Sequence, residues 1–580
     1  MLRPPLDFDL SPDFIFIVYN PSLYRQILAV TSLVIFQLLF FEHSTAAAVS
    51  VSIGQNFTGS SYELNSSALP PDSNGAIGPR HFMEFVNGTV AVYNKTNGLS
   101  VQRKTNLKFW ADAGVIISAD SDVSDPRVIF DPTVQRWFAL QVDFNAAAAS
   151  GDPTLNANDF LLAVSATSDP TGVWHGFLFQ ADPDTGTFAD FPTLGLDANA
   201  VYISGDMYQG ELNPLGAGLV SIPKADLLLN PPVIANRTWF GVMDYAERGQ
   251  VLQPAICFDG GSSGAVLAMG DIGYDSFPHS NVVMFAVLNS ASPTASLSAS
   301  TNLIVTPYRV PDNLDLGVPQ FNVSQPDGTT TLQANDARLS SKVYSVGGVL
   351  YAVHSTQVNN HIAIRWYRIN ATNQTVLESG TIADPNLDLF FPSIAANGSG
   401  AVVIGYNGAS TDTFVSCYAS VGETVNGVTA FGNPILLQSG AVSYHDLGEI
   451  QAQLLMAPVV DSRWGDYSAT SVDPNNPSHF WTIQMYPSGT GSTLDEGIWS
   501  TQITELIVLQ PPLLTIVPQG TNVLVSWPVS ASGFHLQTTT NLMATNTWFS
   551  VSQTLFTNGS QISALVPRNN SSGFYRMKSP

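Results

Sequence analysis

Four aspartates stand just ahead of strand-like segments that recur along the chain: Asp72, Asp125, Asp190 and Asp466. Acids at equivalent places of a repeat would converge on one rim, where they would bind a sugar or a cation. Glycosidases hold two such carboxyl groups about 5–9.5 Å apart, one as the acid and one as the base or nucleophile. The alternative is that each aspartate caps its own turn by accepting hydrogen bonds from backbone N–H groups.

The loop from Arg463 to Asp466 adds two further groups to this set. Arg463 supplies a cation, and Trp464 is the tryptophan that we expect to be most exposed and able to stack on a sugar ring. The other tryptophans lie mostly in apolar strand patterns, where packing in the core is expected. The candidate ligand-binding residues are therefore Asp72, Asp125, Asp190, Arg463, Trp464 and Asp466.

Asp120 and Asp122 alternate with Asp125 and are the candidate metal ligands. Their spacing lacks the glycine and the distal glutamate of an EF-hand loop, so a solvated acidic loop is the favoured interpretation. No His-Glu-x-x-His motif occurs, and no Gly-x-Ser-x-Gly lies between a strand and a helix. We therefore expect no cofactor, with a structural Ca²⁺ as the exception that the acids would allow.

An internal repeat would position these residues. Its unit is a Pro or Ser, four mostly apolar residues, then Asp, Asn or Gly, a tight turn and a second apolar strand. Asp, Asn and Gly suit the turn because they tolerate its dihedral angles. Five clear copies and two degenerate ones are Pro126–Asp131, Pro192–Asp197, Pro254–Asp259, Pro392–Asn397 and Ser468–Asp473, with Ser73–Gly78 and Ser341–Val346.

Successive copies begin 51 to 87 residues apart. A four-stranded propeller blade needs about 40–50 residues, so these intervals fit blades with variable outer loops. After the copy at Pro126, three more strands are expected near 137–144, 160–166 and 174–179. We predict an all-β chain with a seven-bladed β-propeller over residues 49–507, and six blades as the alternative. The ring would close by pairing of the strand near 498–507 with the N-terminal part.

A small β-sandwich is predicted after the propeller, over residues 508–580. Pro511-Pro512 marks a linker, and short alternating segments such as 522–527 and 561–566 follow it. Such period-two alternation is typical of half-buried strands. Five to seven of them fit a two-sheet sandwich.

Residues 1–48 are predicted to be a signal segment with an over-extended start. Arg25 precedes an apolar run over 27–41, and Ala46-Ala47-Ala48 provides small residues for cleavage. The run is short for a membrane span, which needs about 20 residues, although a retained anchor is the alternative. We expect a secreted or cell-surface protein with no span in the mature chain.

The composition supports an exported β protein. Only 11% of residues are charged, 44% are apolar, and 45 glycines and 37 prolines supply turns. The net charge of −24 repels nucleic-acid phosphates, so no nucleic-acid partner is expected. Cys257 and Cys417 lie in apolar runs, and two buried free thiols are favoured over one disulfide bridge.

Three strings carry a resemblance to exported bacterial, sialidase-like β-propeller proteins of mostly unknown function: Pro71-Asp-Ser-Asn-Gly-Ala-Ile-Gly-Pro-Arg-His81, Arg463-Trp-Gly-Asp-Tyr-Ser-Ala-Thr-Ser-Val-Asp-Pro474 and Phe480-Trp-Thr-Ile-Gln484. The tail, with Val525-Ser-Trp-Pro528, resembles a fibronectin-III-like module of Verrucomicrobia-type exported proteins. The resemblance implies an extracellular setting and no established activity. It also suggests that Thr167–Trp174 is a structural Asp-box.

Sialidases use three arginines, a Tyr–Glu pair and an acid/base aspartate. Five arginines lie near predicted strands: Arg127, Arg136, Arg338, Arg365 and Arg463. No convincing Tyr–Glu pair accompanies them, and Glu449 is one of few glutamates in a plausible loop. We therefore predict an exported, non-catalytic binding or scaffold protein with a glycan or protein ligand at the funnel mouth. The alternatives are a glycoside hydrolase using the funnel carboxylates and a protein-interaction scaffold without a small ligand.

Overall fold

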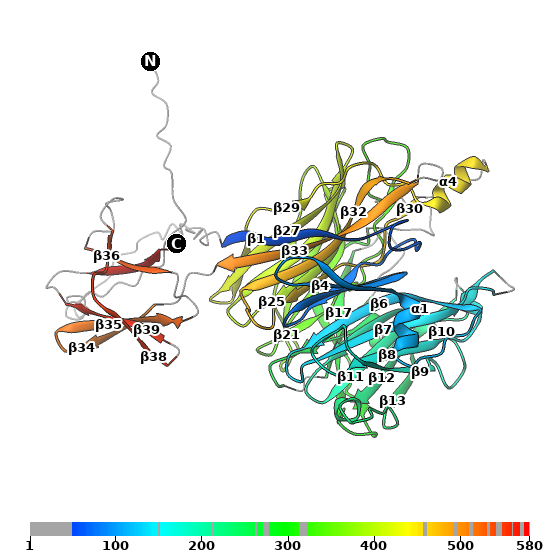
Figure 1. Cartoon of the computed structure of the whole chain (residues 1–580), viewed down its shortest axis with the longest axis horizontal. Coiled ribbons are helices and arrows are strands. Elements are labelled where there is room, and N and C mark those ends of the chain that lie inside the picture. The colour runs from blue at the N-terminus through cyan, green and yellow to red at the C-terminus, as the bar shows by residue number, and fades with distance from the viewer. Residues whose placement is uncertain are drawn as a thin grey trace, which may run out of the picture. The chain divides into compact units, whose positions relative to one another are not determined.

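The computed structural model describes residues 49–148, 151–210, 213–261, 264–270, 278–311, 322–455, 461–491, 496–509, 514–529, 534–540, 548–559, 561–568 and 573–578. The predicted signal segment, residues 1–48, lies outside these described residues. Contacts divide the chain into two compact units, one of residues 51–508 and one that includes 509–580. Both consist almost entirely of β-strands (Figure 1). None of the helices in the described ranges combines the length and apolar character that a membrane crossing requires.

The 51–508 unit is built of antiparallel sheets in which strands consecutive in sequence pair with one another. The first two sheets are four-stranded, and the next four strands form one end of a nine-stranded sheet. They comprise β2 (Asn74–Ile77), β3 (His81–Val86), β4 (Thr89–Asn94) and β5 (Ser100–Thr105); β6 (Ser121–Asp131), β7 (Arg136–Asn145), β8 (Asp159–Ser165) and β9 (Trp174–Gln180); and β10 (Phe188–Leu196), β11 (Ala200–Tyr208), β12 (Pro214–Pro223) and β13 (Thr238–Met243). Strands β7 to β9 confirm the three predicted after the first clear copy of the repeat.

Four further groups of strands follow the same order, and the second of them forms the other end of the nine-stranded sheet. They comprise β14 (Gln250–Pro254), β16 (Ala265–Met269) and β17 (His279–Leu288) with β18 (Ser296–Leu297) and β19 (Thr301–Tyr308); β21 (Tyr344–Val346), β22 (Val349–Val358), β23 (His361–Asn370) and β24 (Thr375–Ile382); β25 (Asp388–Ala396), β26 (Ala401–Ser410) and β27 (Thr413–Val425) with β28 (Val428–Phe431) and β29 (Ile435–Gln438); and β31 (Ala469–Val472), β32 (His479–Thr490) and β33 (Gly497–Leu509) with β1 (Ser50–Ser61). Strand β33 pairs with β1, which agrees with the predicted pairing of the last strand with the N-terminal part.

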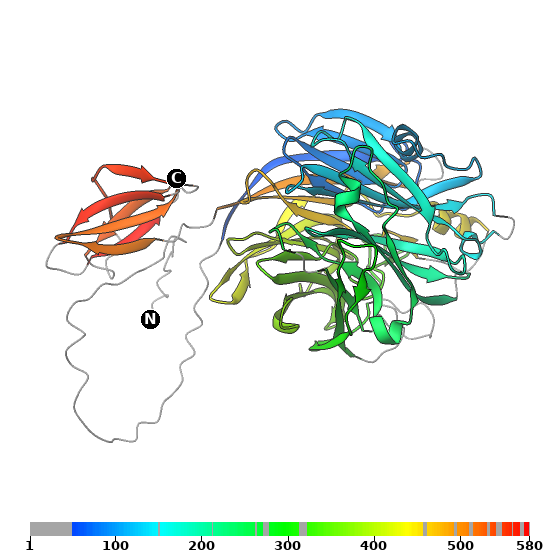
Figure 2. The same ribbon diagram turned by 90° about the horizontal axis from the view of Figure 1, so that it is seen from below.

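The first strands of these sheets lie next to one another. Strand β2 contacts β6, β6 contacts β10, β25 contacts β31, and β31 contacts β2. Between them, β15 (Ile256–Cys257) pairs in parallel with both β10 and β21. These parallel pairs, and hydrogen bonds that join equivalent positions of other first strands, such as the Val128 N–H to Asn74 Oδ1 (3.2 Å) and Ser468 to Ser393 (2.9 Å), show that the strand starts gather at one side of the unit. Figure 2 shows the sheets fanned side by side, an arrangement typical of β-propeller-like folds.

Four first strands contain a β-bulge at or just before the start of the predicted repeat. At each bulge one non-glycine residue has a positive φ, a conformation that side chains with a Cβ rarely adopt. A bulge re-aims the neighbouring side chains, so it is often found beside a binding site. These residues are Asp125 (61°), Phe191 (49°), Val251 (56°) and Phe391 (46°).

The repeat's turn residues form the turns that the sequence predicts. Each side-chain oxygen accepts a hydrogen bond from the backbone N–H two residues on, as in an Asx-turn. The bonds are Asp131 to Thr133 (2.8 Å), Asp197 to Asn199 (2.8 Å), Asp259 to Gly261 (3.3 Å), Asn397 to Ser399 (3.1 Å) and Asp473 to Asn475 (2.8 Å).

The same side chains also bind a lysine or backbone atoms beside the neighbouring set of strands. The repeat pattern does not predict this second role. The pairs are Asp131 with Lys224, Asp197 with the Gly264 N–H, Asp259 with the Gly347 N–H, Asn397 with the Pro477 carbonyl, and Asp473 with Lys95. In this way one repeated residue both closes its turn and links neighbouring sheets.

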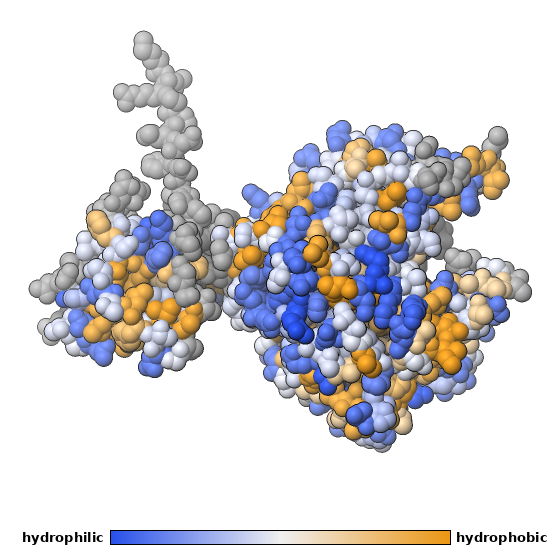
Figure 3. All heavy atoms as spheres, in the orientation of Figure 1, coloured by the Kyte–Doolittle hydropathy of each residue, from blue (hydrophilic) through white to orange (hydrophobic). Residues whose placement is uncertain are grey.

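Aromatic and aliphatic side chains fill the space between sheets, as predicted for most tryptophans. Trp110, Trp137 and Trp481 are fully buried, and the Phe130 and Trp137 rings lie 4.9 Å apart. Cys257 and Cys417 are both free, buried thiols, which confirms the favoured interpretation. Figure 3 shows the exterior, where hydrophilic surface is interrupted by apolar patches, one of them at the end of α4 (Leu447–Leu454).

Short helices and one extra sheet connect these strands. The helices are α1 (Asn106–Asp112), α2 (Lys224–Leu227) and α3 (Tyr245–Arg248), together with α4 and a 3-10 turn (Pro153–Leu155). A two-stranded parallel sheet joins β20 (Leu332–Gln333) to β30 (Ser462–Arg463). It links the segment after β19 to the segment before β31, and both segments supply site residues.

The second unit contains two antiparallel sheets. One consists of β34 (Thr515–Gln519), β35 (Asn522–Pro528), β39 (Gln561–Pro567) and β38 (Leu555–Asn558), and the other of β37 (Phe549–Ser550), β36 (His535–Thr539) and β40 (Phe574–Lys578). One apolar cluster, with Trp527 from the first sheet and Leu536 and Met577 from the second, joins them. This is the layering of a sandwich, and the fibronectin-III-like description stays a prediction.

Candidate functional site

The structure places all four predicted aspartates just before the repeated segments of the first strands. Asp72 and Asp466 precede β2 and β31, whereas Asp125 and Asp190 lie inside β6 and β10 beside their bulges. Because the first strands gather their starts at one side, these carboxyl groups come together. We call the four aspartates and Arg463 the acid cluster.

Asp72 is the structural centre of the acid cluster. Its Oδ1 accepts a hydrogen bond from the Asp466 N–H (2.9 Å), and its Oδ2 accepts one from Asn87 Nδ2 (2.8 Å). The Asn87 Oδ1 accepts in turn from the Asp125 N–H (3.0 Å). The 2% exposed Asp72 carboxyl thus ties three strand starts together. Burial, followed by the charges of Asp466 and Asp125, raises the pKa of Asp72 well above its usual range.

Asp466 is the member of the acid cluster that pairs with a cation. Arg463 Nη2 donates to both of its carboxylate oxygens at 3.1 Å, and Asn335 Nδ2 donates to Oδ1 at 3.0 Å. The Arg463 side chain remains 52% exposed. A half-exposed guanidinium beside carboxylates offers both donors and acceptors to a polar ligand.

Asp125 and Asp190 are the members whose carboxyl groups are least engaged. Asp125 accepts a hydrogen bond from the neighbouring Ser124 hydroxyl (2.8 Å), and among the described residues no side chain donates to Asp190. Burial, then the charges of Asp190 and Asp466, raises the pKa of Asp125 to about 7. Burial, then Asp466, also raises the pKa of Asp190. Asp125 is therefore placed to hold or release a proton near neutral pH.

A fifth acid, Asp206, was not identified from the sequence. It lies on β11 directly opposite Asp190 in the strand register, and burial raises its pKa to about 6. Its Oδ1 is buried and has no hydrogen-bond partner among the described residues. Only the pairing of β10 with β11 brings it to the site, and the sequence pattern does not specify that register.

Three of the five candidate arginines reach this side of the unit. The Phe191 ring lies between Arg127 and Arg338, whose guanidinium carbons are 5.0 and 4.6 Å from its centroid, and Arg463 belongs to the acid cluster itself. Arg136 binds carbonyls of its own turn and Arg365 lies within β23. Arg338 is engaged by Asp336 through two hydrogen bonds of 2.9 and 2.7 Å, so its fork is not open to a substrate carboxylate.

The predicted exposure of Trp464 is wrong. The ring is only 2% exposed, packs edge-on against Tyr444 (4.9 Å between centroids), and donates from Nε1 to Asn407 Oδ1 (3.3 Å). The polar neighbours Arg463 and Asp466 suggested an exposed loop, but burial of a large apolar ring is favourable even when the adjacent residues are polar. Trp464 therefore supports the loop from below and offers no stacking surface.

The candidate metal ligands Asp120 and Asp122 lie apart from the acid cluster in their contacts. Both are exposed, and Asp122 accepts a hydrogen bond from the adjacent Val123 N–H (2.8 Å). Within the residues that the structure describes, no three His, Cys, Asp or Glu side chains are grouped to hold a metal ion.

The Asp-box interpretation agrees with the structure. Asp169 accepts hydrogen bonds from the Thr171 N–H (3.0 Å) and hydroxyl (2.7 Å), and Trp174 Nε1 donates to the Pro170 carbonyl (2.8 Å). The Trp174 ring packs against Phe109. This segment shapes a hairpin and contributes no functional group.

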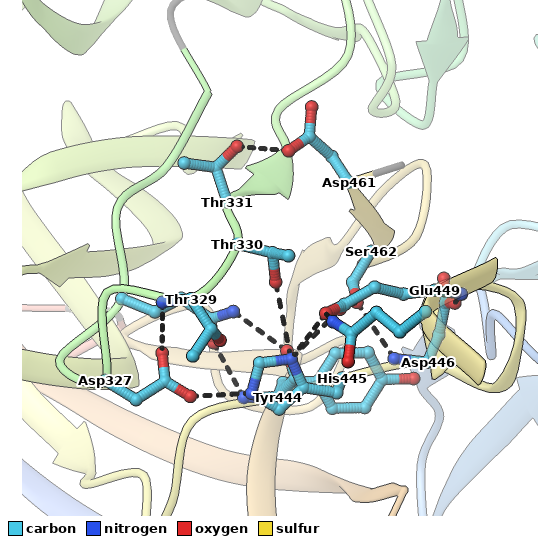
Figure 4. Close-up of polar contacts among 12 residues, drawn as sticks. Asp327, Thr329, Thr330, Thr331, Tyr444, His445, Asp446, Glu449, Asp461 and Ser462 are labelled. Atoms are coloured by element: carbon cyan, nitrogen blue, oxygen red, sulfur yellow. Dashed lines mark hydrogen bonds and ion pairs between the residues drawn. The ribbon is translucent and has the colours of Figure 1, made fainter. Parts of the chain in front are cut away.

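Beside the acid cluster, His445 lies between two carboxylates (Figure 4). Its Nε2 is 2.7 Å from Asp327 Oδ2, and its Nδ1 is 2.9 Å from Glu449 Oε2. The hydrogen bond to Glu449, opposed by burial and aided by Asp327, raises the pKa of His445 to about 9. Because both ring nitrogens donate to carboxylates, the imidazolium has no free lone pair and cannot act as a general base.

This histidine cluster fastens the loop that carries Arg463. The Ser462 hydroxyl donates to Glu449, and Asp446 accepts from the Arg463 N–H (2.6 Å) while it caps α4. Glu449, which is fully buried, is thus a structural partner and not a sialidase-type nucleophile.

We expect His445→Gln to lower stability most at pH 6 and progressively less towards pH 10. The pKa of about 9 lies above the unfolded value near 6.5, so the stabilising charge is fully present below pH 6.5 and is lost as the pH rises through 9. Thermal unfolding of both proteins across this range measures the difference. His175→Gln, in β9, is the control, and a pH-independent difference at His445 would contradict the expectation.

No family model and no curated protein sequence matches this chain. Solved structures with a similar fold include a protein of unknown function from Dyadobacter fermentans (9% identity, TM-score 0.33, covering 80% of this chain and 97% of that one). Others are a Bacillus licheniformis GH43 endo-arabinanase (10%, 0.29, 62% and 96%) and a Trypanosoma rangeli sialidase (8%, 0.28, 92% and 60%). At these TM-scores, none of the three assigns an activity to this chain.

Proposed function

We propose that this is an exported, non-catalytic glycan-binding protein whose 51–508 unit is a seven-bladed β-propeller. Seven groups of antiparallel strands, two of them joined through β15 into one nine-stranded sheet, the contact of β31 with β2, and the pairing of β33 with β1 support a closed ring. The apolar run over 27–41 supports export. In such a ring the acid cluster lies at one mouth of the central channel.

The observation that carries the proposal is the acid cluster itself. Asp125 and Asp190 have carboxyl oxygens that few protein groups occupy, and the half-exposed Arg463 lies beside them. Neighbouring sugar hydroxyls can each donate to a carboxylate and accept from a guanidinium, which suits this mixture of acceptors and donors. An apolar or anionic ligand would leave the buried acids unpaired, so the site favours a neutral, hydroxyl-rich ligand over a protein surface.

We expect Asp190→Asn to weaken glycan binding at least tenfold. The change keeps the shape of the side chain but removes the charge and one strong acceptor, and charged hydrogen bonds contribute about 1.5–3 kcal/mol each. An immobilised glycan panel identifies a ligand, and titration of that oligosaccharide measures the affinity. Asp412→Asn, an exposed aspartate in the turn between β26 and β27, is the matched control. Absence of any glycan binding, or equal affinity of Asp190→Asn, would refute the proposal.

One observation favours glycoside hydrolysis as a second candidate. With a pKa of about 7, Asp125 carries a proton on about half of the molecules at neutral pH, as a general acid requires. If this candidate is right, the bound glycan releases reducing ends, and Asp125→Asn abolishes release while binding persists. Binding without release by the unaltered protein would leave the non-catalytic proposal standing.

A further inference from the structure

A second cavity lies at the opposite ends of the first strands. It has a volume of about 280 Å³. Asp259, Gly398 and Pro477 form exposed parts of its lining, so it opens to solvent. Its walls are mostly apolar and include Ile77, Ile129, Phe130, Ala396 and Val472. The acid cluster contributes none of these residues, so the cavity is separate from the glycan site.

Lys342 is the basic side chain in this lining. It is 5% exposed, and its Nζ donates to one acceptor, the Gly75 carbonyl, at 2.9 Å. Among the described residues no carboxylate pairs with it. An ammonium group has three N–H donors, so the charged form would leave two of them unsatisfied here, whereas a neutral amine would leave only one and would bury no charge.

A neighbouring cation acts on the amine in the same direction. Arg127, 2% exposed, donates to the Ser340 carbonyl (3.0 Å) close to Lys342, and its Nη2 has no partner in the described part of the chain. Burial, and then the charge of Arg127, lowers the pKa of Lys342 to about 7. Lysines made nucleophilic in proteins show these two conditions, an apolar surrounding and a nearby cation.

We propose that Lys342 is a carbonyl-reactive amine that binds a small apolar aldehyde or ketone in this cavity as an imine. The neutral amine attacks the carbonyl carbon to form a carbinolamine. This species then loses its oxygen as water, which carries both amine protons, and a C=N bond replaces the C=O bond. No oxidant or reductant takes part. The apolar walls hold the rest of the ligand and limit hydrolysis.

The experiment uses the whole chain with benzaldehyde and cyanoborohydride at pH 7, which reduces any imine to a stable secondary amine. Peptide mass spectrometry then gives the extent of labelling at each lysine. We expect Lys342 to react at least tenfold faster than Lys108, whose side chain is 63% exposed and ion-paired. The Lys342 rate should rise through a midpoint near pH 7.

A variant that fills the cavity tests the location. Val472→Trp narrows the opening and leaves Lys342 in place, so it should lower the labelling of Lys342 but not of Lys108, with folding checked by thermal unfolding. Equal rates at Lys342 and Lys108 in the unaltered protein, or unchanged labelling in folded Val472→Trp, would overturn the proposal. The first comparison needs no variant, so a folding defect cannot obscure it.

Discussion

Lys224→Met is expected to lower the free energy of unfolding by about 3–5 kcal/mol, the cost of removing one partner from a buried ion pair. Lys224 is 3% exposed and Asp131 is fully buried, and their atoms lie 2.8 Å apart. Methionine fills similar volume but leaves the carboxylate without its counter-ion. Since Asp131 also closes the turn between β6 and β7, its hydrogen bond to the Thr133 N–H would suffer as well.

Urea unfolding measures this effect, and two controls interpret it. Lys108→Met breaks an exposed pair with Asp112 and should cost less than about 1 kcal/mol. Combining Lys224→Met with Asp131→Asn removes the unpaired charge but keeps an Asx-turn acceptor, so the double variant should recover part of the loss. Equal losses from Lys224→Met and Lys108→Met would show that the buried pair does not hold the two sheets together.

Asp125→Asn is expected to stabilise the protein at pH 8 while it impairs the proposed site. The folded pKa of about 7 lies above the unfolded value near 3.8, so folding retains a proton that the unfolded chain releases. Stability therefore falls as the pH rises from about 4 to about 7 and stays low above that. Asparagine removes this penalty, which at 1.36 kcal/mol per pKa unit is on the order of a few kcal/mol.

Thermal unfolding at pH 4, 6 and 8 tests the direction of this effect. The variant and the unaltered protein should differ least at pH 4 and most at pH 8, where the variant melts higher. Asp120→Asn, an exposed aspartate shortly before Asp125 in the sequence, should leave the curve unchanged. A lower melting temperature for Asp125→Asn at pH 8 would mean that this carboxylate is stabilised by a partner, and the acid cluster would need another description.

A rise in stability when a binding-site residue is replaced is common where a site brings like charges together. Asp72, Asp125 and Asp190 are each desolvated, and each is near another carboxylate. Their charges oppose folding, yet the bulges of β6 and β10 hold Asp125 and Asp190 in place. Hydrogen bonds from the Asp466 N–H and Asn87 hold Asp72. Carboxylate oxygens that accept no hydrogen bond from the protein can accept one from a bound hydroxyl group, so the proposed ligand would gain the most hydrogen-bond energy there.

The acid cluster could be predicted from the sequence because equivalent positions of a structural repeat lie close together in the fold. Asp72, Asp125, Asp190 and Asp466 precede equivalent strands, and parallel first strands bring equivalent positions together. Position within the repeat also marks Lys342. Arg127 and Lys342 both occupy the second position of their copies, where the other copies have uncharged residues.

The residues that sequence patterns missed depend on register and on long-range packing. Asp206 joins the site because β11 pairs with β10 in one particular register. His445 forms a hydrogen bond with Asp327, which lies 118 residues earlier in the sequence. Trp464 is buried by Tyr444 and Asn407, although its immediate neighbours are polar. Local composition indicates what a residue can do but not which distant side chain will cover or pair with it.

The sequence by itself determined the strands, the turns and the side of the sheets on which the aspartates gather. Hydrophobic alternation and Asx-turn chemistry are local, so they can be recognised in consecutive residues. Only the tertiary structure decided which acids stay open, which are consumed as partners, and which turn residues also link sheets. The reason is physical: burial, pKa and ion pairing depend on the groups that folding brings within a few ångströms, and these come from distant parts of the chain.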